Sequence, residues 1–543
     1  MNGVEKRKFN RLVNNPVLED YSLRYAPSSF RKWSPWAVYL SGIGGIAAMA
    51  GYAIGGSLAI QYGFQNAFWA ISLVSVIIFL TGWPIAYEIA KNNIDMDLLT
   101  RAAGFGYLGS TLTSLIYASF TFIYFSLEGA IMAQAITDYF HIPIFLSYLI
   151  CGVLIIPLVL YGMTFLSKFQ KWTQPVWLIL LLVALFGVAI RDPHSLTQWI
   201  AFKGQSSNSG FSWLMLGAAG SVLMSLVAQI GEQADYLRFM PDVTEKNRRS
   251  WMWAVILGGP GWILIGGAQN LMGTYLASYV APRAGMAHAN VPFTMFDYAF
   301  QTVFTHPAMA LAIATALVLL SQLKINVTNA YSGSLSWSNF FSRTLHTHPG
   351  RVVWLVFQVA IGVLIMEMGI FGAIDKILAF YSNVAVAWIG AVVADLVINK
   401  KLLKLSPNTI EFKRAHLYNF NPVGFGSMIL ASLISIVAYF GTFGAALQAY
   451  SPFLALLLAM IFSPIIAVVT KGKYYIARNS SYTLPAGMKT ATCSVCNHPF
   501  EVHDLAQCPF HAGAICSLCC SLEAHCHDEC KTKDEVAAEQ EVG

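Results

Sequence analysis

Long apolar runs separated by short polar segments are the dominant pattern of this chain. Each run is about 18 residues or longer and carries few charges, which is the length an α-helix needs to cross the hydrocarbon core of a bilayer. A transmembrane β-barrel would instead show short segments of alternating hydrophobicity. The pattern predicts an all-α polytopic membrane protein with twelve spans, at residues 36–61, 65–89, 108–137, 143–163, 174–190, 211–234, 251–275, 307–337, 351–371, 376–398, 424–446 and 449–470.

Basic residues lie mainly on one side of the predicted membrane. The loops on that side hold fifteen Lys and Arg residues, whereas the loops on the other side hold four. The segment before the first span adds seven, and the tail after the last span adds six. Because cytoplasmic loops are rich in Lys and Arg, we expect both termini in the cytoplasm and the protein in the inner membrane of a bacterium. These loops also account for the net charge of +6, so no nucleic-acid partner is implied.

The eighth predicted span turns from apolar to polar along its length. Residues 309–320 are apolar, but residues 321–339 include a lysine, three asparagines and a run of hydroxyl side chains. A lysine in the middle of a span costs roughly 3 kcal/mol in lipid. The polar residues form two stripes at helical spacing, so we expect protein on both sides of this helix. The stripes are Ser321, Lys324, Thr328 and Tyr331, and Gln322, Asn326, Asn329 and Gly333.

Lys324 is the residue of this span that is most costly to bury. It is either paired with a carboxylate, Glu128 or Glu232, or held neutral because it is removed from water. In either state, an ionisable group inside a membrane is a candidate for function.

The third span carries an aromatic residue and a carboxylate on one face. Tyr124 and Glu128 are four residues apart, so they lie one above the other on a helix. A flat ring could stack on Tyr124 and donate its N–H groups to Glu128. Alternatively, Glu128 pairs structurally with Lys324 or with a backbone donor. In the sixth span, Gln229 lies deep enough to be a second ligand-binding side chain.

Glycine is concentrated in the first and sixth spans. Residues 41–51 read SGIGGIAAMAG, and residues 217–220 read GAAG. For any single glycine, close packing between helices is the simpler explanation. Because the glycines recur in the first span of each group of five, they also predict an inverted repeat with two discontinuous helices.

Four short motifs in register resemble one family of transporters. They are NPVLED at 15–20, DLLTRAAGFGYLG at 97–109, ADYLRF at 234–239 and TNAY at 328–331. Their order and spacing over residues 15–470 are similar to those of the nucleobase–cation symporters, which include purine, cytosine, allantoin and hydantoin permeases. The resemblance implies the LeuT-type fold, a 5+5 inverted repeat with two further helices. It also implies transport of a nucleobase-like substrate by alternating access.

The resemblance extends to individual residues. The ring-binding pair of the family's third span corresponds to Tyr124 and Glu128, and the asparagine of its eighth span corresponds to Asn329, within one position. The tryptophan of its sixth span, which stacks on the ring, has no match in residues 225–228. We expect substrate contacts from Tyr124, Glu128, Gln229, Asn326, Asn329 and Gly44, and a cation site or coupling site at Lys324, Thr328, Gly42 and Gly45.

The family's sodium site is altered in this sequence. In the family, backbone carbonyls of the first span, near residues 42–45 here, combine with two adjacent hydroxyls of the eighth span. Those two hydroxyl positions are Lys324 and Ile325 in this chain. An ammonium group at this place would supply the charge of the ion, so we expect sodium independence, with coupling to protons or to no ion.

Eight of the nine cysteines follow the last span. Two Cys-x2-Cys pairs with further Cys and His within about 40 residues are typical of zinc sites, and the reducing cytoplasm disfavours disulfides. An iron–sulfur cluster is the alternative, and the spacing leaves open which ligands pair and whether they form one site or two. The candidate ligands are Cys493, Cys496, Cys508, His511, Cys516, Cys519, Cys520, Cys526 and Cys530.

The sequence ICSLCCSLE at 515–523 is similar to a segment of bacterial transporter-like sensors, where it joins the membrane domain to a kinase or cyclase. Two functions therefore remain open. One is a secondary transporter; the other is a receptor that reports ligand occupancy through the tail to a separate signalling protein. An enzyme is not indicated, because the spans carry no nucleophile–base pair, phosphate loop or catalytic metal motif.

These features divide the chain into five predicted parts. The transporter domain contains most of the motifs of the resemblance, and the tail contains the candidate metal ligands. The parts are a cytoplasmic N-terminal segment (1–35), the twelve-helix transporter domain (36–470), a linker (471–489), a zinc-binding Cys/His segment (490–532) and a disordered acidic end (533–543).

Overall fold

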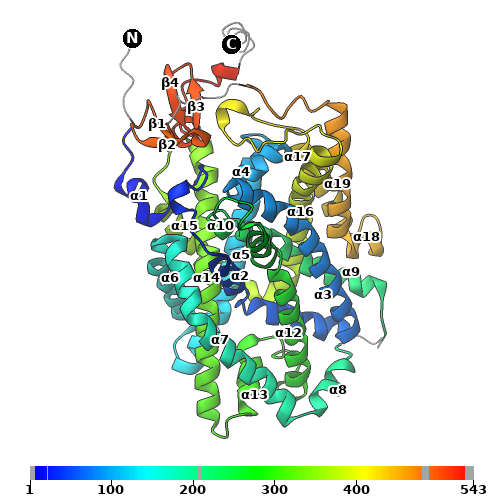
Figure 1. The fold of residues 1–543 in the computed structure, drawn as a ribbon. Coiled ribbons are helices and arrows are strands. Elements are labelled where there is room, and N and C mark those ends of the chain that lie inside the picture. The colour runs from blue at the N-terminus through cyan, green and yellow to red at the C-terminus, as the bar shows by residue number, and fades with distance from the viewer. Residues whose placement is uncertain (1–6, 21, 206–209, 480–487, 532–543) are drawn as a thin grey trace.

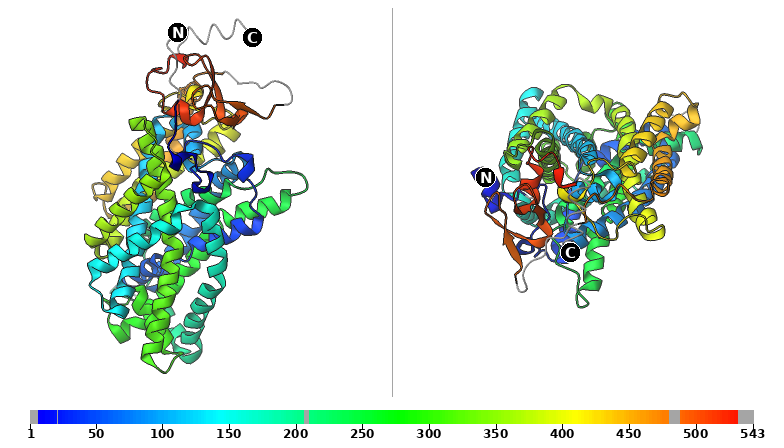
Figure 2. Two further views of the ribbon diagram at one scale, coloured as in Figure 1. Left: turned by 90° about the vertical axis from the view of Figure 1, so that its left-hand side faces the viewer. Right: turned by 90° about the horizontal axis from the view of Figure 1, so that it is seen from above.

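A long bundle of helices carries a small β-containing module at one end (Figure 1). The structure is a computed structural model that describes residues 7–20, 22–205, 210–479 and 488–531. The acidic end predicted at residues 533–543 lies outside these described residues. The short helix α1 (Arg11–Asn14) lies toward the module end, whereas α8 (His194–Ile200) and α13 (Pro292–Gln301) lie at the opposite end (Figures 1 and 2).

The first group of five spans begins with a broken helix. Span 1 starts as α2 and resumes as α3 after an irregular segment at residues 46–49. Spans 1 and 2, predicted as separate helices, are joined in α3 by a bend at Gly63, whose φ of 76° is costly for a residue with a Cβ. The helices are α2 (Pro35–Gly45), α3 (Ala50–Asn92), α4 (Met96–Thr100), α5 (Gly109–Phe140), α6 (Ile144–Leu160) and α7 (Gly162–Arg191).

The second group of five repeats the interruption in its first helix. Span 6 consists of α9 (Trp213–Leu223), a 3-10 segment (Met224–Gln229) and α10 (Ile230–Leu237). The discontinuities predicted for spans 1 and 6 are therefore confirmed. Span 7, predicted as a single helix, is divided at residues 259–261, where Pro260 lacks a backbone N–H. The further helices are α11 (Arg248–Gly258), α12 (Trp262–Ala284), α14 (Pro307–Leu345), α15 (Arg351–Glu367) and α16 (Ile374–Ala394).

Two more spans and the module complete the chain. The last helices of the bundle are α17 (Gly424–Tyr439), α18 (Ala445–Ala449) and α19 (Ser451–Val469). In the module, β1 (Thr490–Thr492) pairs antiparallel with β2 (Pro499–Glu501), and β3 (Leu505–Cys508) pairs antiparallel with β4 (Gly513–Cys516). The short helix α20 (Ser517–Ser521) follows β4 directly.

The outer surface of the bundle is apolar. Among the described residues, eight helices are long and apolar enough to cross a membrane, and α6 and α17 are shorter apolar helices. Helix α3 contains the second half of predicted span 1 and all of predicted span 2, and α15 corresponds to predicted span 9. All twelve predicted spans are therefore helical. Large exposed apolar side chains recur along α6, α7, α15, α17 and α19, for example Val153, Ile179, Leu364, Leu433 and Leu457. A surface of this kind is stable in lipid rather than in water.

The polar half of α14 is enclosed by protein. This helix packs along α5 and also contacts α15, α13 and α7. Apart from Leu323, every residue from 321 to 339 is buried, including Lys324 with none of its surface exposed. The prediction that protein surrounds both polar stripes is confirmed, and α14 forms the centre around which the candidate site is built.

Candidate functional site

Glu128 lies at the break in span 1. Its Oε2 atom accepts hydrogen bonds from the backbone N–H groups of Met49 and Ala50, both at 3.0 Å, and from Gln322 Nε2 at 2.7 Å. Met49 and Ala50 form the N-terminus of α3, where backbone N–H groups have no partner within the helix and the helix dipole favours a negative charge. The carboxylate of α5 therefore caps the second half of span 1.

Glu128 also lines a small cavity between the two broken spans. Within the described part of the chain, Glu128 Oε1 is buried and has no hydrogen-bond partner. The cavity has a volume of about 30 Å³, which is enough for two or three water molecules. Its walls come from both broken spans and from α5, α12 and α14. They include Gly45, Ile46, Phe120, Tyr124, Glu128, Gln229, Glu232, Trp262, Gln269, Asn270 and Asn329.

Three further wall residues carry polar atoms without a partner among the described residues. These atoms are Glu232 Oε1, Trp262 Nε1 and Asn270 Oδ1, and all are buried. A buried polar group without a partner costs about 1–3 kcal/mol, so polar atoms gathered around one cavity are usually satisfied by bound water or by a ligand. The wall thus offers carboxylate and amide oxygens as acceptors and an indole N–H as a donor.

Five of the ten predicted membrane-domain residues line this cavity. Tyr124 hydrogen-bonds with Ser225 of span 6 at 3.2 Å, which links α5 to the second broken span. Asn326 lies beside the cavity wall, because it accepts a hydrogen bond from Asn329 at 3.2 Å. The five that line the cavity are Tyr124, Glu128, Gln229, Asn329 and Gly45, and the five that do not are Asn326, Gly44, Gly42, Lys324 and Thr328.

Lys324 lies on the opposite face of α14, against α7. Its Nζ donates to Gln170 Oε1 at 2.6 Å and to Thr173 Oγ1 at 3.1 Å, and Gln170 Nε2 donates back to the Lys324 carbonyl at 2.7 Å. The alternative in which Lys324 pairs with Glu128 or Glu232 is wrong for this structure. A Cβ added at Gly44 would lie 2.5 Å from the Gln170 side chain, so the ammonium group is near the first half of span 1.

Sequence reasoning missed the contribution of α12. Trp262 begins this helix, Gln269 donates to the carbonyl of Ala48 in the break of span 1, and Asn270 lies one residue further along. The signal that could have indicated them is the pair of amide side chains in an otherwise apolar span, following the Gly-Pro-Gly interruption. Trp262 supplies an aromatic wall in a site where the tryptophan of the sixth span is missing.

Comparisons with known proteins agree with this architecture. No protein-family model matches the chain, and no curated protein matches its sequence. The inward-facing structure of Mhp1 is 16% identical with a TM-score of 0.59, over 86% of this chain and 95% of that one. Mhp1, a nucleobase-cation-symport-1 family transporter, is also matched in a closed conformation with bromovinylhydantoin bound, at 15% identity and a TM-score of 0.57, over 84% of this chain and 99% of that one.

A third solved structure is more distant in sequence. It is a sodium-coupled sialic acid symporter in a substrate-bound outward-open state, with 10% identity and a TM-score of 0.60, over 84% of this chain and 94% of that one. The fold is of the LeuT type. At these identities the similarity establishes the 5+5 inverted repeat with two further helices, in which α2–α3 and α9–α10 are the two discontinuous helices.

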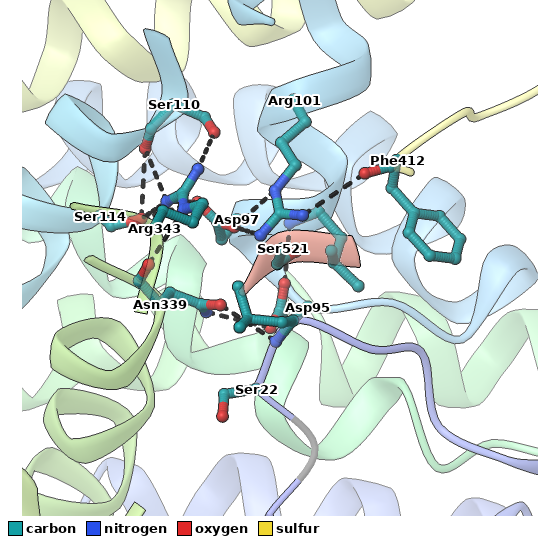
Figure 3. Close-up of polar contacts among 12 residues, drawn as sticks. Ser22, Asp95, Asp97, Arg101, Ser110, Ser114, Asn339, Arg343, Phe412 and Ser521 are labelled. Carbon is teal, nitrogen blue, oxygen red and sulfur yellow. Dashed lines mark hydrogen bonds and ion pairs between the residues drawn. The ribbon is translucent and has the colours of Figure 1, made fainter. Parts of the chain in front are cut away.

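A buried charge network joins α4, α5 and α14 of the LeuT-type bundle (Figure 3). Asp97 pairs with Arg101 at 2.6 Å and with Arg343 at 2.7 Å, and none of the three side chains is more than 6% exposed. Ser114 donates to Asp97 at 2.6 Å, and Arg343 donates to the Ser110 hydroxyl at 2.5 Å. Burial alone would raise the pKa of the Asp97 carboxyl, but the two guanidinium groups outweigh burial and lower that pKa.

In the module, four thiols lie close together in a group that we call the compact thiol set. The Sγ atoms of Cys493, Cys496, Cys516 and Cys519 lie within 4.8 Å of one another, and all four residues are buried. Hydrogen bonds from the other three thiols lower the pKa of Cys493. The predicted ligand His511 is not in this set; its Nε2 lies 2.9 Å from Glu523 Oε2.

The module is fastened to the membrane domain through the N-terminal segment. Glu501 accepts hydrogen bonds from the Ser28 backbone N–H at 2.8 Å and from its hydroxyl at 2.6 Å, and it lies 3.6 Å from Arg31. Arg7 donates to the Cys519 carbonyl at 3.0 Å. The segment that leads into α2 is therefore held by residues of the cysteine module.

Proposed function

We propose that this protein is a secondary transporter that carries a nucleobase-like heterocycle across the membrane by alternating access. The observation that supports this most directly is the cavity at the two helix breaks, where polar atoms of Glu128, Glu232, Trp262 and Asn270 have no partner among the described residues. A planar ring with N–H and C=O groups at its edge would satisfy these donors and acceptors. The faces of such a ring would stack on Tyr124 and Trp262.

The size of the cavity fits a closed state of such a transporter. A volume of about 30 Å³ is too small for a heterocycle, so the substrate enters only when the walls separate. Movement of one helix group against the other around a central site is the basis of alternating access. The hydantoin bound in Mhp1 is a ring with alternating N–H and C=O groups, and we propose the same substrate class here: a purine, cytosine, allantoin or hydantoin.

Uptake into proteoliposomes tests this function. Radiolabelled members of the four substrate groups are offered to the purified protein, and binding is followed separately by thermal shift. We expect accumulation of at least one compound, and a loss of at least tenfold in Trp262→Ala because the ring loses a stacking surface. Trp253→Ala, on the exposed face of α11, is the matched control. Binding without accumulation would favour the receptor alternative. The absence of both binding and uptake would contradict the proposal.

Sodium independence is part of the proposal. The Lys324 ammonium group lies near Gly44, with the Gln170 side chain between them. We propose that transport is coupled to protons or to no ion. Replacing sodium by choline should leave wild-type uptake unchanged, and Lys324→Ser should reduce uptake at least tenfold. Lys376→Ser, at an exposed lysine, should have no effect. Stimulation of the wild-type protein by sodium would overturn this part of the proposal.

We also propose that the compact thiol set holds zinc and that the module faces the cytoplasm of a bacterium, with the bundle in the inner membrane. Four thiolates match the ligand type and number of structural zinc sites, in which sulfurs about 2.3 Å from the metal lie roughly 3.8 Å apart. The orientation follows from the excess of Lys and Arg in the N-terminal segment, the tail and the loops on that side. A separate signalling protein at this face belongs to the receptor alternative.

A further inference from the structure

The four remaining cysteines of the module surround a second cavity. Cys508 ends β3, Cys520 lies in α20, and Cys526 and Cys530 follow in the last described segment. All four line a cavity of about 250 Å³, which no member of the compact thiol set borders. The eight thiols of the tail are thus divided by the fold into two groups of four, a division that the spacing in the sequence left open.

The second group is more open than the first. Among the described residues, the compact thiol set is the one group of three or more candidate ligands whose donor atoms all lie within 4.8 Å of one another. Cys508 is buried, whereas Cys520, Cys526 and Cys530 are half-buried. A metal at this place would therefore draw the thiols together around it.

Positive charges adjoin this second group. Arg414, from the loop between α16 and α17, donates to the Cys520 carbonyl at 2.8 Å and pairs with Asp528 at 2.9 Å. Lys531 lies 3.2 Å from the same carboxylate. A centre with four thiolates and a divalent ion carries two negative charges. Arg414 and Lys531 offset only part of this charge, because both pair with Asp528 and because Glu523 and Glu529 also line the cavity.

We propose that Cys508, Cys520, Cys526 and Cys530 form a second thiolate metal site, separate from the compact thiol set, and that this site holds zinc. The compact thiol set connects the residues after β1 to β4 and α20. The second site would connect β3 and α20 to residues 526–530, where the 3-10 turn Glu529–Lys531 begins. A module of two short hairpins buries too little apolar surface to be stable without such links.

The second site lies where the module meets the membrane domain. Asp528, between Cys526 and Cys530, accepts hydrogen bonds from Arg414 Nε and from Asn419 Nδ2, both at 2.9 Å. Ala415 of the same loop lines the cavity. A metal held by Cys526 and Cys530 would therefore also fix the carboxylate that fastens the module to the loop leading into α17. This inference is independent of the proposed transport function.

Cobalt titration of the metal-free, full-length protein tests the second site. Co²⁺ replaces zinc in tetrahedral thiolate sites and gives a thiolate-to-metal absorption that can be counted against added metal. We expect saturation at two equivalents per chain in the wild-type protein and in Cys151→Ser, whose thiol lies in α6. In the double variant Cys508→Ser/Cys530→Ser, we expect saturation at one equivalent. That remaining equivalent also shows that the compact thiol set, and with it the module, is still folded.

Two results discriminate further. Saturation at one equivalent in the wild-type protein, unchanged in the double variant, would overturn the proposal. If the protein as purified contains iron and acid-labile sulfide that the double variant lacks, the four thiols hold an iron–sulfur cluster; the site is then supported, but zinc as its metal is refuted.

Discussion

Glu128→Ala is expected to reduce substrate uptake at least a hundredfold. The substitution removes the acceptor for Met49 N–H, Ala50 N–H and Gln322, and it removes a second carboxylate oxygen, without a partner among the described residues, from a side chain that lines the cavity. Hydrogen bonds to a charged group are worth roughly 1.5–3 kcal/mol each, and every 1.4 kcal/mol is a factor of about ten in affinity. Loss of one substrate contact together with disorder at the start of α3 is therefore expected to lower uptake by more than a factor of about 100. Initial uptake rates and substrate affinity by calorimetry measure the effect.

Two other variants separate capping from substrate binding. Glu128→Gln keeps one oxygen as an acceptor for the N-terminus of α3 but replaces the other by an N–H donor, so it should remain as thermally stable as wild type and still lose most of its uptake. Glu367→Ala, at an exposed carboxylate at the end of α15, should behave as wild type. Normal uptake by Glu128→Ala would contradict the placement of the substrate beside α5.

Features that depend on local spacing were predictable. The twelve spans follow from apolar run length. That spans 1 and 6 are discontinuous was predicted from their glycines and from their position in two groups of five, although the breaks themselves, residues 46–49 and 224–229, contain no glycine and the glycines lie in the flanking helices. The pairing of Tyr124 with Glu128 follows from a separation of four residues on one helix. Burial of α14 on two faces follows from its two polar stripes, because neither stripe could face lipid.

Features that depend on packing between distant segments were not predictable. The partners of Glu128 are backbone N–H groups, which nearly every residue has and which carry no sequence signal. Lys324 contacts Gln170, and only the docking of α7 against α14 brings these together. Trp262, Gln269 and Asn270 reach the cavity because α12 packs along α3. Likewise, the division of eight cysteines into two groups depends on how the hairpins fold.

The motif at residues 97–109 has a structural explanation in this fold. Asp97 and Arg101 do not line the cavity; they pair with each other, and Asp97 also pairs with Arg343 at the end of α14. Tyr107, in the same motif, accepts from Arg343 through its carbonyl and donates to the Ser521 carbonyl of the module. The motif at residues 97–109, in the loop between spans 2 and 3, thus contacts the end of α14. Through Tyr107 it also contacts the C-terminal module.

Asp97→Asn is expected to lower the free energy of unfolding by about 3–5 kcal/mol, the usual effect of removing one partner of a buried ion pair. The substitution leaves Arg101 and Arg343 buried without this counter-charge, since their exposed fractions are 1% and 0%. Asp242→Asn is the matched control: it breaks the ion pair with Arg31, but Asp242 is 70% exposed, so the change should stay within about 1 kcal/mol. Thermal unfolding in detergent, followed by tryptophan fluorescence, measures both.

The pH dependence gives an independent check on the same network. Because Arg101 and Arg343 hold the pKa of Asp97 below its usual value, the carboxylate contributes stability above the pKa of an unfolded aspartate, about 3.9. This contribution is lost as the pH falls through the lowered folded-state pKa. The difference in unfolding temperature between wild type and Asp97→Asn should therefore be constant between about pH 5 and 8 and shrink below about pH 4. Equal unfolding temperatures at neutral pH would show that the two buried arginines do not depend on Asp97.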